Sequence, residues 1–326
     1  MKIGLWDIDG HNYPNLALMK LSAWHKAQGD DVGLVDYPTL EHYDKVYASK
    51  VFGDEYSKLP DTLPWTDEII FGGTGFAITI ENGKEVFHKD RDINLPEKIE
   101  HIYPDYSLYP ELTKDRAYGY LTRGCPNNCS FCIVSKKEGR SSVKVADLSE
   151  FWNGQKYIDL LDPNLLACKD RLELLNQLAE SKAKVNFTQG LDARFITEET
   201  AKALAKVKTE RVHFAFDFMK NEKAIINGLK TFQKYCPTDS RKAIVYMLTN
   251  YDTTLEQDLY RMQMIKECGF QPDVRIYRKS TAPQYLIDLQ HWCNNRIISR
   301  SCKLEDFVPR VDGKTFKELY LQGGTQ

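Results

Sequence analysis

The sequence predicts an α/β protein in which a partial (β/α)6 TIM-like barrel follows a small Rossmann-like domain. Three observations lead to this prediction. Short apolar strands alternate with helix-length segments from residue 115 to residue 295, which is typical of parallel sheets with crossover helices. Polar residues follow directly after these strands. A separate strand–helix alternation occupies residues 1–76, and 326 residues are enough for both domains.

The Rossmann-like domain is expected over residues 1–76. Pro14 suits the first position of its helix, and Gly29 suits the end of that helix. The last strand runs into the turn 72–75, Gly-Gly-Thr-Gly, a place where open α/β sheets often bind ligands. This turn lacks the full dinucleotide-binding fingerprint, so it is a weak indication of a NAD site. The expected strands are 3–8, 32–35, 46–52 and 68–71.

Residues 77–114 read as a linker because they contain Asn82-Gly83 and several prolines. The aromatic residues around 104–110 predict that the linker packs along a surface.

Six β/α units are expected in the barrel, residues 115–295, and residues 296–326 form a C-terminal tail. Two sequences, 147–150 and 253–256, read as capping boxes that open helices. Because a closed barrel has eight units, six predict a partial barrel, with its chemistry at the carboxyl ends of the strands. The expected strands are 118–124, 157–161, 185–188, 211–216, 243–248 and 273–277, and the later helices are 170–182, 197–206, 222–235, 253–269 and 283–294.

The most specific motif is Cys125-Pro-Asn-Asn-Cys129-Ser-Phe-Cys132, which follows the first barrel strand. Three thiolates can hold three irons of a [4Fe–4S] cluster and leave the fourth iron open to another ligand. Two alternatives are a zinc ion with a fourth ligand from elsewhere, and reduced thiols without a metal. The paired Cys-x2-Cys spacing of a zinc finger is not present. The other five cysteines are scattered singly and show no second-cluster spacing.

This motif, together with the six β/α units, resembles the radical S-adenosylmethionine (SAM) superfamily over about residues 115–290. The resemblance implies that Cys125, Cys129 and Cys132 bind the cluster and that Phe131 lies near the adenine. It also implies that SAM chelates the open iron. One electron then splits SAM into methionine and a 5′-deoxyadenosyl radical, which takes a hydrogen atom from a substrate.

The resemblance also suggests SAM-binding residues at the ends of later strands. Asp162 and Asn164 stand where the superfamily usually has a Gly-Gly-Glu-like stretch that meets the methionine amino group. Candidates for binding the carboxylate or the ribose follow the third strand: Gln189, Asp192 and Arg194. Asp217 follows the fourth strand. Loop capping and surface ion pairing are the alternative roles for these four side chains.

Cys168 lies just beyond the Asp162–Asn164 turn, so its thiol is a candidate donor of a hydrogen atom to a product radical. The alternative is a small buried residue at the start of a helix.

The N-terminal domain resembles the cobalamin-binding-like domain of many radical SAM proteins. Its Asp9-Gly-His11-Asn-Tyr-Pro14 partly matches the cobalamin loop, with Pro14 in place of the final glycine. A scaffold or a lid is the other role open to this domain. The whole arrangement resembles a class of short bacterial and phage radical SAM proteins that has no assigned substrate.

Other branches of the superfamily fit less well. No cysteine precedes residue 125, so the extra cluster of the methylthiotransferases has no ligands in this sequence. The substrate stays open between a nucleoside or nucleic acid, a metabolite and a peptide. The alternative functions are a cobalamin-dependent methylase and a non-enzymatic zinc or iron–sulfur sensor.

Composition bounds the partners. The net charge of −2 gives no global attraction to nucleic acid, although local basic groups could supply a path. These groups are equally typical of a solvated surface. The first residues read as a strand instead of a signal peptide, and no apolar run has the length of a membrane span. We therefore expect a cytoplasmic protein with a flavodoxin- or ferredoxin-like reductant. The basic groups are Lys136, Lys137, Arg140 and Lys144 near the cysteines, and Arg296, Arg300 and Lys303 near the C-terminus.

Overall fold

The computed structural model describes residues 1–10, 12–81 and 84–321. The chain divides into two compact units, Met1–Val185 and Asn186–Gln326, and each is described separately. This division lies inside the expected barrel. The domain boundaries expected at residues 76, 114 and 295 therefore stay predictions.

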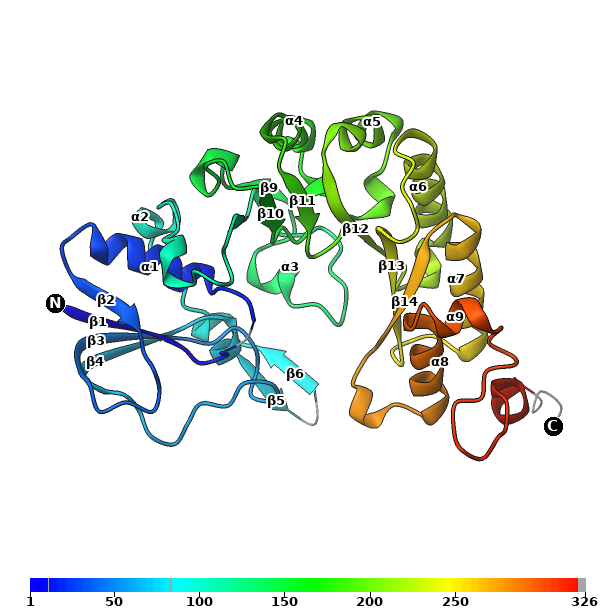
Figure 1. The fold of residues 1–326 in the computed structure, drawn as a ribbon, viewed down its shortest axis with the longest axis horizontal. Coiled ribbons are helices and arrows are strands. Elements are labelled where there is room, and N and C mark those ends of the chain that lie inside the picture. The colour runs from blue at the N-terminus through cyan, green and yellow to red at the C-terminus, as the bar shows by residue number, and fades with distance from the viewer. Residues whose placement is uncertain (11, 82–83, 322–326) are drawn as a thin grey trace. The chain divides into compact units, whose positions relative to one another are not determined.

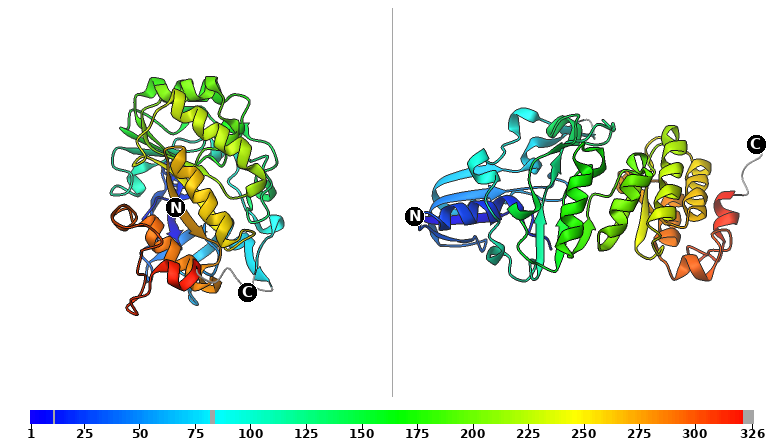
Figure 2. Two further views of the ribbon diagram at one scale, coloured as in Figure 1. Left: turned by 90° about the vertical axis from the view of Figure 1, so that its right-hand side faces the viewer. Right: turned by 90° about the horizontal axis from the view of Figure 1, so that it is seen from above.

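A four-stranded parallel sheet forms the start of the first unit (Figures 1 and 2). Helix α1 (Leu16–Lys26) lies along it and contributes Leu18 and Met19 to a core shared with Ile3 and Leu5. The prediction that Pro14 is the first residue of this helix is wrong. The helix begins at Leu16 because Asn15 is its N-cap, and the Asn15 side chain accepts a hydrogen bond from the Leu18 N–H. The strand order is β2 (Asp31–Leu34), β1 (Lys2–Asp7), β3 (His42–Ser49) and β4 (Trp65–Gly72).

The expected linker contains regular structure that the sequence reading missed. A hairpin joins β5 (Ile78–Glu81) to β6 (Lys84–Phe87), and the expected turn at Asn82-Gly83 lies outside the described residues. The aromatic stretch is packed: the Tyr109 hydroxyl donates to Asp7 Oδ2 at 2.7 Å. The remaining elements are η1 (Thr74–Ala77), η2 (Lys89–Arg91), α2 (Glu97–Glu100) and η3 (Tyr106–Leu108).

A second, six-stranded sheet confirms the predicted α/β class. Its strands appear in the order β14-β13-β12-β11-β10-β7, and the β7–β10, β12–β13 and β13–β14 pairs are parallel. The order ends at β14 and at β7, so the described strands form an open sheet and no closed barrel. The strands are β7 (Arg116–Gly119), β10 (Tyr157–Leu160), β11 (Lys184–Phe187), β12 (Thr209–Ala215), β13 (Ala243–Thr249) and β14 (Gln271–Ile276).

Helices follow the strands as the alternation predicts, and in the second unit α6, α7 and α8 lie beside β12–β14 (Figure 1). Two local predictions need correction. The capping box at Asp147 opens only the short η4 (Leu148–Glu150), and the box before α7 uses Thr254 and Gln257, one residue later than predicted. The helices are α4 (Arg171–Ser181), α5 (Glu198–Lys206), α6 (Glu222–Tyr235), α7 (Leu255–Glu267), α8 (Gln284–Asn294) and α9 (Ile298–Ser301).

Shorter elements join these helices and strands. They are η5 (Leu165–Ala167), η6 (Ala193–Phe195), η7 (Met219–Asn221), η8 (Lys279–Thr281) and the π-helical turn η9 (Lys317–Leu321).

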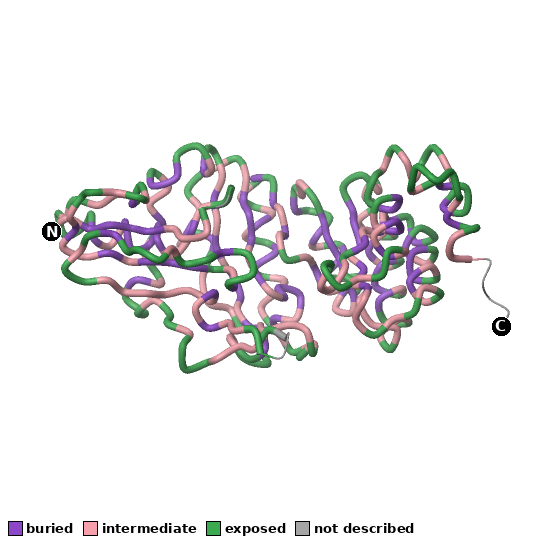
Figure 3. The backbone as a smooth tube through the Cα atoms, turned by 90° about the horizontal axis from the view of Figure 1, so that it is seen from below, coloured by how far each residue is buried: buried purple, intermediate pink, exposed green. Residues whose placement is uncertain are grey.

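Both units contain buried stretches of chain (Figure 3), such as β1 in the first unit and β13 in the second. Within residues 1–10, 12–81 and 84–321, no helix combines the length and the apolar composition that crossing a bilayer requires.

An ion pair in the core of the second unit joins Arg261 to Asp258, both in α7 and both almost fully buried. The Arg261 guanidinium also donates to the Phe216 and Leu248 carbonyls, just beyond β12 and within β13. One side chain thus links α7 to the carboxyl-end region of two strands.

We expect Arg261→Met to lower the free energy of unfolding by about 3–5 kcal/mol, because it leaves the Asp258 carboxylate buried without its charged partner. Arg241→Met is the matched control, since Arg241 pairs with Asp239 at the surface. Urea unfolding of the two variants measures the difference. Equal losses in both variants would contradict the structural role of the Arg261 network.

Candidate functional site

The cysteine motif lies in a loop closed at its base by two short antiparallel strands, β8 (Thr122–Arg123) and β9 (Val143–Lys144). Gly124 begins the loop with φ +85°. A Cβ atom there would lie 2.2 Å from the Ser141 carbonyl oxygen. Both the conformation and the close approach therefore require glycine immediately before Cys125.

Glu138 holds the loop closed from its far end. Its carboxylate accepts hydrogen bonds from the Gly124 N–H at 3.1 Å and from Arg123 Nη1 at 3.0 Å. The Cys125 N–H donates to the Gly139 carbonyl at 3.2 Å. The residues on the two sides of the cysteine loop are therefore bonded to each other, which limits how far Cys125 can move.

The three cysteines are partly exposed and are not joined in disulfides, and so they remain accessible to a metal centre. The Cys132 N–H donates to the Cys129 carbonyl at 3.0 Å, which forms a turn between the last two cysteines. Helix α3 (Val134–Lys137) follows the motif, and the Phe131 side chain is half-buried. Three thiols on one anchored loop suit an iron–sulfur cluster, because thiolates are its usual ligands.

Asn164, just after β10, contacts the motif directly. Its Nδ2 atom lies 3.5 Å from Cys125 Sγ and donates to it. Its backbone carbonyl accepts a hydrogen bond from the Ser142 hydroxyl at 2.8 Å, and the residue is only 2% exposed. The structure thus brings together Cys125 and Asn164, two residues predicted from the sequence.

Asp162 supports the strand that leads to the cysteines. Its carboxylate accepts hydrogen bonds from the Leu121 and Thr122 N–H groups, at 3.1 and 2.6 Å, and from the Thr122 hydroxyl at 2.7 Å. Burial raises the pKa of Asp162 to about 6, although these donors favour the ionised form. The Asp162 carboxylate is thus hydrogen-bonded to Leu121 and Thr122. Its contact with SAM stays a prediction.

Cys168 follows η5 and is fully buried. Its thiol lies 3.9 Å from Asp170 Oδ2, and its carbonyl accepts from Arg171 Nη1 at 3.1 Å. This environment is that of a small packed residue at a helix start, which was the alternative to a hydrogen-atom donor. The donor role stays a prediction.

In the second unit, the residues after β11 and β12 form their own group. Asp192 and Arg194 make a two-point ion pair of 2.8 and 2.7 Å, while Gln189 is exposed. Asp217 accepts a hydrogen bond from the Leu248 N–H at 3.0 Å. Burial raises the pKa of Asp217, and the nearby Asp192 carboxylate adds to this effect. Arg261 and Arg194 oppose it. These three polar residues are therefore electrostatic neighbours, as their positions after adjacent strands predict.

Several supporting residues were not predicted. Glu138 and Ser142 carried no spacing signal, because their partners are distant in sequence or are backbone groups. Gly228 in α6 carried a weak signal in the sequence, because glycine is unfavourable inside a helix. A Cβ atom on Gly228 would lie 1.8 Å from the Ala193 carbonyl oxygen, so this glycine lets α6 approach the turn that carries Asp192 and Arg194.

The glycine-rich turn after β4 packs against its own chain. A Cβ atom on Gly75 would lie 2.2 Å from the Phe52 carbonyl oxygen, and Lys50 fills the space beside Gly73 and Gly75. Asp9, from the cobalamin-like stretch, accepts from the Val51 and Phe52 N–H groups. His11 lies outside the described residues. Internal packing therefore explains why glycine stands at positions 73 and 75. The contacts of Asp9 do not support the binding of cobalamin.

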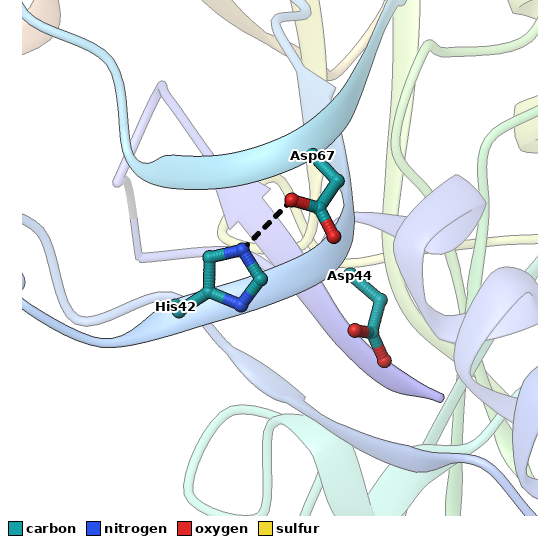
Figure 4. A group of neighbouring side chains, drawn as sticks. All are labelled: His42, Asp44 and Asp67. Atoms are coloured by element: carbon teal, nitrogen blue, oxygen red, sulfur yellow. Dashed lines mark hydrogen bonds and ion pairs between the residues drawn. The ribbon is translucent and has the colours of Figure 1, made fainter.

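A group of possible metal ligands lies at the start of β3 and in β4 (Figure 4): His42, Asp44 and Asp67. His42 Nε2 already pairs with Asp67 Oδ1 at 3.0 Å, and Asp44 accepts a hydrogen bond from the Lys2 N–H. His42 and Asp44 are half-buried and Asp67 is exposed. Acidic groups at the surface are common without an ion, so this group is not taken as a metal site.

The basic residues after the cysteines differ in their surroundings. Lys144 pairs with Asp147 and Glu173, both at 2.8 Å. Lys137 is half-buried, donates to the Thr74 hydroxyl, and has a pKa lowered by burial. Lys136 and Arg140 are exposed.

No protein-family model matches this chain. It is similar to a tRNA-2-methylthio-N(6)-dimethylallyladenosine synthase of Sulfurihydrogenibium sp. (strain YO3AOP1), with 23% identity over 232 residues, which is 62% of this chain and 53% of the relative. It is also similar to the ribosomal protein uS12 methylthiotransferase RimO of Clostridioides difficile (strain 630), with 23% identity over 218 residues, 64% of this chain and 46% of the relative.

The chain thus spans about half the length of these relatives. Distant similarity to methylthiotransferases supports the radical SAM superfamily that the cysteine motif resembles. It does not support the narrower short bacterial and phage class.

Asp162 should make stability depend on pH. Its pKa in the folded state, about 6, lies above the ordinary value of 3.8, so the folded state binds the proton more tightly. The free energy of unfolding of the wild type, relative to Asp162→Asn, should therefore fall as pH rises from about 4 to about 6, by at most about 1.4 kcal/mol per pH unit.

Asp239→Asn is the control for this measurement, because Arg241 lowers the pKa of Asp239 to about 2. Its contribution changes only below about pH 4, outside the window. Urea titrations at several pH values measure both differences. A flat difference for Asp162→Asn between pH 4 and 6 would contradict a buried carboxyl with a raised pKa.

Proposed function

We propose that this protein is a radical SAM enzyme that holds one [4Fe–4S] cluster on Cys125, Cys129 and Cys132. One observation carries the proposal: the three-cysteine motif lies on an anchored loop that follows the first strand of a six-stranded sheet. The distant similarity to methylthiotransferases also supports it. The finer arrangement, a partial (β/α)6 barrel around the cluster, is part of the proposal.

The cluster, when bound, would supply an electron and an open iron at which SAM is cleaved to methionine and a 5′-deoxyadenosyl radical. The chain holds the motif in place. Gly124 and Glu138 fix the start of the loop, Asp162 anchors the strand before it, and Asn164 donates a hydrogen bond to one thiol. Three ligands on a restrained loop leave one coordination position for SAM.

The remaining site assignments follow from this function. We propose that Phe131 packs near the adenine and that Asn164 and Asp162 border the methionine end. Cys168 is the proposed hydrogen-atom donor, and its thiol is buried away from solvent. The proposed contacts to the carboxylate and ribose of SAM are Gln189, Asp192, Arg194 and Asp217.

The substrate class is open between a nucleoside or nucleic acid, a peptide and a metabolite. The two relatives are named for a methylthio modification of tRNA and of a ribosomal protein. The extra cluster of the methylthiotransferases has no cysteine ligands before residue 125 here. We therefore propose that the protein shares with these relatives the abstraction of a hydrogen atom from carbon, without the transfer of a methylthio group. The reductant is a flavodoxin- or ferredoxin-like protein.

Anaerobic reconstitution tests the proposal. The wild type should bind close to four irons per chain, show the broad visible absorption of a [4Fe–4S] cluster, and release 5′-deoxyadenosine from SAM when reduced by dithionite. Alanine at Cys125, Cys129 or Cys132 should abolish 5′-deoxyadenosine release, because each variant removes one of three ligands. Iron content, absorption and product chromatography are the measurements.

Cys236→Ala is the matched control, because Cys236 is a partly exposed free thiol outside the motif. It should retain the iron and the activity of the wild type. Zinc at one ion per chain, with no iron, in folded wild-type protein would overturn the proposal and favour a zinc-binding protein.

A further inference from the structure

The geometry points to a role for Asn164 beyond the binding of SAM: we propose that its amide N–H raises the reduction potential of the cluster through a hydrogen bond to Cys125 Sγ. The inference rests on the proposed function, because it concerns the cluster that Cys125 would help to hold. The contact itself is a feature of the chain, with Asn164 Nδ2 and Cys125 Sγ 3.5 Å apart.

The backbone that carries the amide is held by two hydrogen bonds to its carbonyl oxygen. The Asn164 carbonyl accepts hydrogen bonds from the Ser142 hydroxyl, at 2.8 Å, and from the Ala167 N–H, at 3.3 Å. Ser142 directly precedes β9, which pairs with β8 at the base of the cysteine loop, so the same strand pair helps to position the donor and the sulfur. The hydrogen bond is therefore a built contact between two anchored segments.

The charge of the sulfur decides which end of the amide faces it. A cysteine bound to iron is a thiolate and has no proton to donate, so an amide oxygen facing it would place two negative atoms together. The N–H orientation is the favourable one. Because Asn164 is 2% exposed, water does little to weaken the interaction.

A hydrogen bond to a thiolate ligand acts more strongly on the reduced cluster than on the oxidised one. One-electron reduction adds a negative charge that spreads onto the sulfurs, and the positive end of the N–H dipole stabilises that charge. Hydrogen bonds to the sulfurs are among the determinants of cluster potentials. Asn164 thus makes the cluster easier to reduce by the electron donor.

The experiment is a redox titration of the reconstituted full chain without SAM, followed by electron paramagnetic resonance of the reduced cluster. Asn164→Leu removes the donor at nearly constant volume. At the wild-type midpoint potential, its ratio of reduced to oxidised cluster should fall at least tenfold, which corresponds to a midpoint about 59 mV more negative for one electron. Asn164→Asp should shift the midpoint in the same direction, because it also adds a negative charge.

Asn15→Leu is the matched control. Asn15 is another buried amide of the same unit, and its Nδ2 donates to the Ser49 hydroxyl instead of a sulfur. This variant should lower the thermal stability and leave the midpoint unchanged.

Unchanged midpoints in Asn164→Leu and Asn164→Asp, with wild-type iron content, would overturn this inference and leave the proposed function standing. Loss of the cluster in both variants would also overturn it, because Asn164 would then serve cluster assembly. A wild type that binds no iron would overturn the proposed function and this inference together.

Discussion

The hydrogen bonds of the Asp162 carboxylate to the backbone of Leu121 and Thr122 are the constraint on which the candidate site depends. They join the end of β10 to the strand that enters the cysteine loop. Asp162 and Asn164 are separated by one residue, so the same turn that anchors the strand also delivers the amide to Cys125. Burial makes this arrangement costly for an ionised carboxyl group, and three donors offset part of that cost.

Glu138, in the later part of the cysteine loop, restrains the loop further by binding residues at its start. The carboxylate binds the Gly124 N–H and the Arg123 guanidinium together, and Arg123 also reaches Glu100 at 3.3 Å. This chain of contacts ties the cysteine loop to the segment that follows the N-terminal sheet. A metal centre with one open coordination position benefits from such a rigid holder, because the ligand atoms keep their places while the fourth ligand changes.

The candidate residues after β11 and β12 are bonded to one another or to the backbone, in addition to their proposed contacts with SAM. Asp192 and Arg194 neutralise each other, and Asp217 holds the backbone of Leu248. The partial burial of Asp192, Arg194 and Asp217 and their electrostatic coupling are expected for a functional cluster of charges, and they are equally typical of a structural network. The contacts of Gly228 show that helix packing determines where the Asp192 turn lies.

The sequence by itself determined the α/β class and five of the six strands of the second sheet, and it contains the three closely spaced cysteines. The strand predicted at 118–124 is wrong in part, because it divides into β7 of that sheet and β8 of a separate two-stranded sheet. Hydrophobic periodicity and motif spacing depend only on residues that are close together in the sequence, so they can be recognised without the tertiary structure. Only the tertiary structure decided which polar side chains face the thiols. The partners of Asp162 and Asn164 lie about forty residues earlier in the chain. The separate hairpin β8–β9 and the residues Glu138 and Ser142 likewise depend on contacts between distant segments, which no spacing in the sequence records.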